Sequence, residues 1–270
     1  MTTPAAPPDP APQTAALESL HAGLWRASSL GSCSSASLPS GFSALDALLP
    51  GGGWPTRCLT EIIGDDSDLL EWRLLAPALG SLFDALPQAA PKRQSSVSRP
   101  LLLINPPHHP HLPGLQACGL QARQLVWVAP ATTQQQLWAL EQAIKSNAAA
   151  ALLAWLPQAR SEQIRRLQCC AQGFDAPIFL FRPWSAQQQA SSAPLRLLLK
   201  PAGNHLQLQI LKRRGPASAL LLNLPAMPAG LGRVLTPAML ARGEAGPANP
   251  PIGIALEPRH ALARLPAFAH

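Results

Sequence analysis

The chain has 270 residues, of which 47% are hydrophobic and 13% are charged, so it is long and apolar enough to form one sizeable folded core. This composition excludes a protein that is disordered throughout, and the absence of a run of about eighteen apolar residues excludes a membrane-spanning helix. The net charge of +7 suits a phosphate-bearing or acidic partner, although it equally suits plain solubility.

The first 37 residues are expected to lie outside the core. Residues 1–13 are rich in alanine, proline and threonine and lack the apolar stretch of a signal peptide. Regularly spaced leucines predict an amphipathic helix over residues 14–28, and a connector rich in serine and glycine follows at 29–37. We predict that the core domain spans residues 38–215.

A strand, a polar loop and a helix are predicted within the segment from Leu38 to Trp72. In a P-loop protein the loop reads G-x-x-x-x-G-K-[ST], because glycine amides cradle phosphate, lysine neutralises it and a hydroxyl holds magnesium. The eight positions here are Gly64, Asp65, Asp66, Ser67, Asp68, Leu69, Leu70 and Glu71. Carboxylates would repel a triphosphate, and they are favoured at a helix start without any ligand. We therefore predict a degenerate phosphate site that holds no cofactor, with an unconventional phosphate or metal site as the open alternative.

Apolar strands and amphipathic helices alternate beyond residue 100. Helices are predicted over 133–147, with Thr132 or Thr133 as the cap, and from Ser161 to Gly173. Four uninterrupted apolar runs are typical of a parallel sheet that is buried on both faces: 101–104, 125–129, 148–156 and 178–181. Three tryptophans fall in this region, and we expect Trp138 and Trp155 to lie in or beside the core, whereas Trp127 could reach a protein interface.

The pattern changes at Leu195. Residues 195–200 and 205–212 flank a turn sequence, and the alternation in the second run predicts a hairpin with one solvated face. The hairpin ends in the densest basic cluster of the chain, Lys212, Arg213 and Arg214, which suits either a solvated strand end or a contact with a protein partner or DNA. Residues 216–270 are rich in proline and alanine, and we expect a largely unstructured tail with short docking segments.

Histidines and cysteines provide few further candidates. His108, His109 and His111 with Cys118 could be read as a metal cluster, but interleaved prolines keep these side chains from converging, so we predict no metal site. Cys169 and Cys170 are adjacent on a predicted helix, which gives little support to a redox role. The five cysteines are odd in number and lack C-x-x-C spacing, which favours a reduced, cytoplasmic location.

Several short motifs together resemble one family over residues 38–215: PGGGWP, LTEIIG, NPPH, LWALEQAIKS, AWLP, RRLQ, FRP and LKRRG. The chain is similar to the ImuA family of translesion-synthesis-associated proteins, which are RecA-like and SulA-like. The resemblance implies an α/β fold with a RecA-like, P-loop-type core, a mainly parallel central sheet, a C-terminal hairpin and flexible tails. It also implies a noncatalytic scaffold of an SOS-induced mutasome. The implied partners are an ImuB-type homologue of Y-family polymerases and an error-prone C-family DNA polymerase, with RecA itself and direct DNA binding as open alternatives.

Most positions of this chain that match the ATPase residues of RecA carry other amino acids. The P-loop lysine falls on Leu70 and the hydroxyl on Glu71, and the strand that would end in a Walker B aspartate ends in Trp155. Pro107 stands where the catalytic glutamate is expected. Because these side chains cannot hold magnesium or activate water, the resemblance implies a protein that is not an ATPase. Weak ATP binding stays open, since Gly64 and the helix amides remain.

A second resemblance supports an alternative function. FLFRPWSA at residues 179–186, together with the preceding AAAALLAWLP, is similar to SulA-like cell-division inhibitors. This resemblance implies binding to the tubulin-like division protein. A third alternative, an active ATP-dependent recombinase, is disfavoured because the P-loop lysine is missing.

Overall fold

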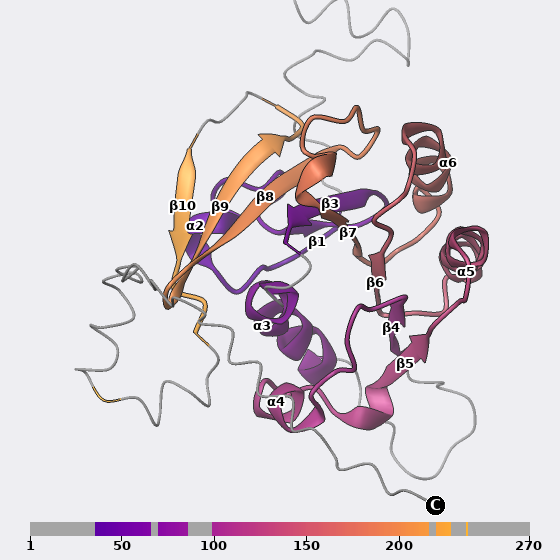
Figure 1. Ribbon diagram of the computed structural model, residues 1–270. Helices are drawn as coiled ribbons and strands as arrows, with labels where there is room; N and C mark the ends of the chain where they lie inside the picture. The colour runs from indigo at the N-terminus through magenta and orange to yellow at the C-terminus, as the bar shows by residue number, and fades with distance from the viewer. Residues whose placement is uncertain (1–35, 66–69, 86–98, 216–219, 228–235, 237–270) are drawn as a thin grey trace, which may run out of the picture.

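The centre of the molecule is a mainly parallel β-sheet (Figure 1). The computed structural model describes residues 36–65, 70–85, 99–215, 220–227 and 236. In this part of the chain, eight strands pair in the order β10-β9-β8-β3-β7-β6-β4-β5. Their bounds are β3 (Leu59–Gly64), β4 (Leu101–Ile104), β5 (Leu125–Val128), β6 (Ala151–Trp155), β7 (Ile178–Pro183), β8 (Leu195–Ala202), β9 (His205–Lys212) and β10 (Leu221–Leu224). Neighbours from β8 to β5 run parallel, whereas β9 pairs antiparallel with both β8 and β10. The predicted α/β class with a mainly parallel central sheet and a C-terminal hairpin is therefore confirmed.

Helices cover the two faces of this sheet. The helices α3 (Leu70–Ala85) and α4 (Leu112–Ala117) pack on one face, and α5 (Thr133–Ser146) and α6 (Ser161–Ala171) pack on the other (Figure 1). Successive strand residues point to opposite faces, so one strand serves both layers. Within β6, for example, Leu153 belongs to the α3 side of the core and Leu152 to the α5 and α6 side.

A short N-terminal segment precedes the sheet. It contains β1 (Ser37–Leu38), α2 (Ser43–Asp46) and β2 (Trp54–Pro55), and β1 pairs antiparallel with β2. A glycine triplet follows α2, and Gly51 and Gly52 turn the chain with φ of 85° and 74°. Trp54 then packs edge-on against Phe179 of β7, which fixes the segment to the α3 side of the core. The amphipathic helix predicted over 14–28 lies outside the described residues.

The capping signals around α5 act as the sequence predicts. The Thr132 hydroxyl accepts a hydrogen bond from the Gln135 amide, and the Gln135 side chain accepts one from the Thr132 amide. The helix ends at Asn147, whose left-handed φ of 48° is a common helix terminus. Leu140 and Ile144 are buried from this helix, as expected. Local propensity and tertiary packing therefore favour the same helix.

Three expectations about burial and extent are corrected. Strand β5 is the last strand of the sheet among the described residues, and its side chains are half exposed rather than buried on both faces. Trp138 is not in the core: it is 63% exposed on α5. Strand β10 lies beyond residue 215, in the region expected to be a largely unstructured tail, and it extends the sheet by pairing with β9. Its residues LLNL form a short edge strand because β9 offers an unpaired backbone edge.

The strand order sends the ends of several strands to one edge of the sheet. The chain leaves β3, forms β4 on the far side of the sheet and returns through β6 to β7, which lies beside β3. We call the edge at which the parallel strands end the C-terminal edge. Open α/β sheets bind ligands at such an edge, at the point where the strand order reverses.

Among the described helices, none is long and apolar enough to span a membrane.

Candidate functional site at the C-terminal edge of the sheet

The positions of the predicted phosphate loop lie between β3 and α3. Gly64 ends β3 and Asp65 is exposed, while residues 66–69 lie outside the described residues. Leu70 and Glu71 begin α3, with exposed fractions of only 5% and 8%. The position that would carry a phosphate-binding lysine is therefore an apolar side chain within the core.

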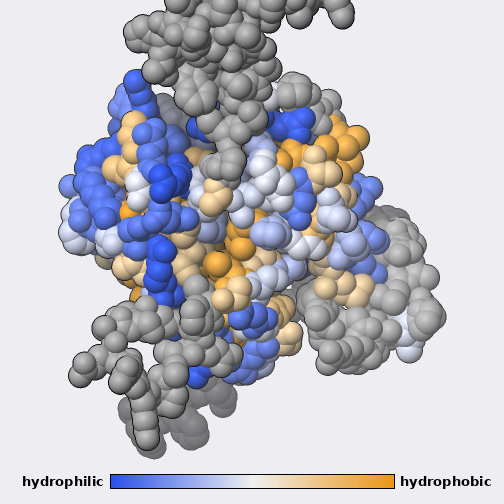
Figure 2. All heavy atoms as spheres, turned by 180° about the vertical axis from the view of Figure 1, so that it is seen from behind, coloured by the Kyte–Doolittle hydropathy of each residue, from blue (hydrophilic) through white to orange (hydrophobic). Residues whose placement is uncertain are grey.

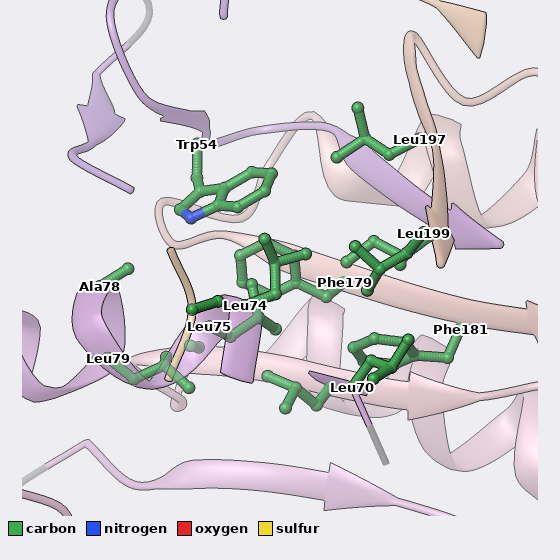
Figure 3. Packing of buried hydrophobic residues seen from close by; sticks show 14 of the residues in the cluster. Trp54, Leu70, Leu74, Leu75, Ala78, Leu79, Phe179, Phe181, Leu197 and Leu199 are labelled. Atoms are coloured by element: carbon green, nitrogen blue, oxygen red, sulfur yellow. The ribbon is translucent and has the colours of Figure 1, made fainter. Parts of the chain in front are cut away.

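An apolar cluster lies behind the start of α3. Leu70 packs beside Phe181 of β7, with Leu199 of β8 in the same cluster (Figure 3). Phe181 in turn stacks on Trp155 of β6, with ring centroids 4.8 Å apart and ring planes 18° apart. Burying phosphate charge against such a surface would be costly. This part of the C-terminal edge is therefore built for packing.

Asn105 holds the ends of three strands together at this edge. Its side-chain amide donates to the carbonyl of Trp155 over 2.9 Å, and its backbone amide donates to the carbonyl of Val128 over 2.8 Å. Its φ of 55° is left-handed, which asparagine tolerates better than most residues. Pro107 follows on an exposed turn. Trp155, at the Walker B position, thus belongs to an aromatic stack. Pro107, at the catalytic-glutamate position, belongs to a rigid turn.

Three charged residues lie buried in the middle of the sheet. Glu61 of β3 accepts from Arg182 Nη1 of β7 over 3.1 Å and from Arg196 Nε of β8 over 2.7 Å. The Glu61 and Arg182 side chains are almost completely enclosed, and that of Arg196 is 10% exposed. A buried charge is tolerated only with well-placed partners, so the three residues form one unit. We call them the Glu61 triad.

The Glu61 triad also fixes the chain that follows β6 and β7. Arg182 Nη2 donates to the carbonyl of Ala159 over 2.6 Å and to Gln189 Oε1 over 2.8 Å. Arg196 Nη2 donates to the carbonyl of Ala186 over 2.9 Å. The two guanidinium groups therefore hold the loop after β7, within the FLFRPWSA segment and beyond it, against the sheet.

The sequence contains a signal for this triad that no motif marks. Each member is the one charged residue within a run of apolar residues, in the segments LTEIIG, IFLFRP and LRLLL. A charge within a strand buried on both faces needs a partner on a neighbouring strand. The pairing itself depends on strand order, which the sequence alone did not provide.

The basic cluster lies at the opposite edge of the sheet. Lys212 is paired in register with Arg196 at the start of β8, and its ammonium donates to the carbonyl of Ser191 over 2.9 Å. Arg213 donates to the carbonyl of Leu48. Two of the three predicted contact residues therefore also bind the backbone of neighbouring loops. The structure does not bring this cluster together with the predicted phosphate loop.

Cys58 lies near Arg214, the third residue of the basic cluster, but burial dominates its chemistry. Burial raises the pKa of the Cys58 thiol to about 11, although the nearby positive charge of Arg214 lowers it somewhat. A thiol with such a pKa is a poor nucleophile at neutral pH. Cys58 therefore acts as a core side chain.

The histidines near α4 make local contacts. His111 caps α4, with its Nδ1 accepting from the Gly114 amide over 3.2 Å, and His109 packs on Trp127 with ring centroids 4.1 Å apart. Burial raises the pKa of the Cys118 thiol. Within the described ranges, no group of three or more histidine, cysteine, aspartate or glutamate side chains could hold a metal ion.

Comparison with known proteins gives one partial similarity. No protein-family model matches the chain. A segment of 97 residues, 36% of this chain, is 29% identical to the cell division inhibitor SulA of Edwardsiella piscicida. The similarity covers 58% of that SulA, so the chain spans less than two thirds of the length of its relative. The SulA-like part of the resemblance is thus supported over that segment, and the comparison does not extend to ImuA.

Proposed function

We propose that this chain is a noncatalytic accessory protein of SOS-induced translesion DNA synthesis. The observation that carries the proposal is the burial of Leu70, at the P-loop lysine position, in a cluster with the stacked rings of Phe181 and Trp155. A RecA-like scaffold with this edge has lost the side chains that grip phosphate, hold magnesium and activate water. Its remaining role is to present surfaces to partner proteins.

The proposed partners follow from the ImuA resemblance. They are an ImuB-type homologue of Y-family polymerases, an error-prone C-family DNA polymerase and RecA. A protein that hydrolyses no nucleotide contributes to such an assembly through binding free energy alone, by raising the effective concentration of the other components. The rigid sheet, fixed internally by the Glu61 triad, provides a stable support for that role.

Gene deletion tests this proposal. Cells that lack the chain should lose DNA-damage-induced mutagenesis while they divide normally, and a plasmid copy should restore mutagenesis. Purified protein should show no DNA-stimulated ATP turnover. Measurable DNA-stimulated turnover would contradict the noncatalytic role, and unchanged damage-induced mutagenesis would contradict the role in translesion synthesis.

The second candidate is a SulA-like cell-division inhibitor. The partial similarity to SulA favours it. The FLFRPWSA segment that suggested it includes Arg182, and its last residue, Ala186, is held by Arg196. In this case the proposed partner is the tubulin-like division protein. Overexpression distinguishes the candidates: filamentous cells support the division inhibitor, and normal septation supports the accessory protein.

A further inference from the structure

A groove lies between α5 and α6, and the proposed function does not yet use it. It has a volume of about 590 Å³, and Leu137 and Leu167 contribute its apolar lining. Its other lining residues are polar or charged apart from the indole of Trp138, and they come from both helices and from the loop between β6 and α6. Hydrophilic residues gather on the side of the molecule where these two helices lie (Figure 2).

Helical spacing explains why Trp138 faces this groove. Gln134, Trp138, Glu141 and Lys145 are three or four residues apart, so they form one stripe along α5. Leu140 and Ile144 take the neighbouring stripe that packs on the sheet. Trp138 is therefore left 63% exposed although the opposite face of its helix packs on the sheet. A large indole exposed beside an apolar lining is typical of a binding hot spot.

The groove is held in shape by polar contacts between its walls. Thr133 Oγ1 at the start of α5 donates to Gln158 Oε1 over 3.3 Å. Across the groove, Arg166 of α6 contacts the Glu141 carboxylate of α5 over 2.6 Å, and within α5 Lys145 holds the same carboxylate over 2.6 Å. The groove therefore exists before any partner arrives, which reduces the entropic cost of binding.

The charge of the groove is positive. The Glu141 carboxylate is already paired with two cations, and Arg160 is a further cation in the lining. The side chain of Arg166 is 71% exposed, so it can contact a second carboxylate. The first turns of α5 and α6 also face the groove through Thr133 and Gln163, and helix N-termini favour negative charge. Glu162 adds one acidic side chain to the first turn of α6 but is outside the groove lining.

We propose that the groove between α5 and α6 binds an acidic peptide segment of a partner protein, with a bulky apolar side chain of that segment against Trp138, Leu137 and Leu167. The partner's carboxylates contact Arg160 and Arg166. The positive charge argues for an anionic partner over a second copy of this basic chain, and the aliphatic surfaces of Leu137 and Leu167 suit an apolar side chain of a protein segment better than a phosphate backbone. The identity of the partner as a component of the damage-tolerance assembly rests on the proposed function, whereas the chemistry of the segment does not.

Selection from a random 12-residue peptide display library on the full-length protein tests this proposal. The selected peptides should be enriched in aspartate and glutamate around a leucine or an aromatic residue. Substitution of Trp138→Ala or Arg160→Glu should weaken binding of a selected peptide at least about tenfold. The matched controls are Trp184→Ala, at an exposed tryptophan outside the groove, and Arg165→Glu, at an exposed arginine outside its lining, and both should bind like the wild type.

Several outcomes would overturn the groove assignment. Enrichment of basic peptides would do so, and so would selected peptides that bind Trp138→Ala as tightly as the wild type. A dimer in sedimentation that Trp138→Ala converts to a monomer would make the groove a self-interface. Displacement of the peptide by a single-stranded 20-mer oligonucleotide would make it a nucleic-acid site.

Different results would contradict the groove assignment and the proposed function. If peptide binding behaves as expected but deletion leaves damage-induced mutagenesis unchanged, the groove assignment stands and the proposed function falls. If deletion abolishes mutagenesis but Trp138→Ala and Arg160→Glu support it fully and the selection yields no acidic peptide, the function stands and the groove assignment falls.

Discussion

The indole of Trp155 stacks on the ring of Phe181 with centroids 4.8 Å apart, at the edge of the sheet where the resemblance to RecA would place a magnesium-binding aspartate. Asn105 fixes the Trp155 carbonyl from the neighbouring strand. Aromatic pairs of this kind contribute free energy beyond the area that they bury. The edge is therefore a packed and structurally important part of the fold.

Restoring the P-loop side chains should not restore ATP hydrolysis. The double substitution Leu70→Lys with Glu71→Thr places an ammonium group at a site that is 5% exposed, beside Phe181. We expect a loss of about 3 kcal/mol or more in the free energy of unfolding, because a buried unpaired charge is costly. Urea denaturation and an ATP turnover assay measure the two effects. Gln134→Lys on the surface of α5 is the control and should leave stability nearly unchanged. ATP turnover by the stable double variant would contradict this prediction.

The Glu61 triad should behave as one unit. Glu61→Leu alone leaves two guanidinium groups buried without their carboxylate, and we expect it to lower the free energy of unfolding by about 3–5 kcal/mol. Replacing all three members with apolar residues, as Glu61→Leu, Arg182→Met and Arg196→Met, should recover most of that loss. Urea denaturation of the single, double and triple variants measures the coupling. Strictly additive losses would show that the three residues do not act together.

The Glu141 carboxylate should stabilise the fold in a pH-dependent way. Hydrogen bonds from Lys145 and then from Arg166 hold its pKa below the ordinary value of 4.5. A carboxyl group with a lowered pKa in the folded state stabilises the protein above its unfolded-state pKa, and this contribution is lost as the pH falls through the folded-state pKa. Wild type should therefore exceed Glu141→Gln in stability at pH 7, and the difference should shrink below about pH 4.5.

Urea midpoints at pH 7, 4 and 3 measure this difference. The difference at pH 7 should also decrease in high salt, because Lys145 and Arg166 are more than half exposed. A difference that grows toward acid pH would contradict the assigned cause of the shift.

The cysteines should differ sharply in their reactivity. Burial raises the pKa of Cys58 to about 11, so this thiol should resist alkylation by iodoacetamide at pH 8 in the folded protein. Cys169 is exposed on α6 and should react before the other three cysteines of the described residues. Mass spectrometry of timed samples gives both rates, and unfolding in urea should make Cys58 reactive. A Cys169→Ser variant should leave the slow modification of Cys58 unchanged, and modification of Cys58 at the rate of Cys169 in the folded protein would contradict its burial.

Local signals in the sequence were sufficient to predict most elements of the core. The strand at 101–104 and the cap at Thr132 were predicted correctly, because an apolar run and a capping box act over a few residues. Burial was harder to predict. Trp138 is exposed although its neighbour Leu137 is half buried, because the face that a helix presents depends on which elements pack on it.

Features that depend on strand order could not be predicted from the sequence. Strand β5 has the composition of a buried strand but lies at the sheet edge, and β10 forms because the edge of β9 is open to it. The partnership of Glu61 with Arg182 joins residues that are 121 positions apart. The groove between α5 and α6 likewise exists only once the two helices are packed side by side.

Damage-induced mutation frequency in cells that lack the chain tests the central claim most directly. Deletion should reduce the frequency to the level of undamaged cells, and a plasmid copy should restore it. The Leu70→Ala variant, which introduces no charge, should restore it as well if it folds, because no phosphate contact is required at that position. An unchanged mutation frequency after deletion, with or without a defect in septation, would contradict the proposed role in translesion synthesis.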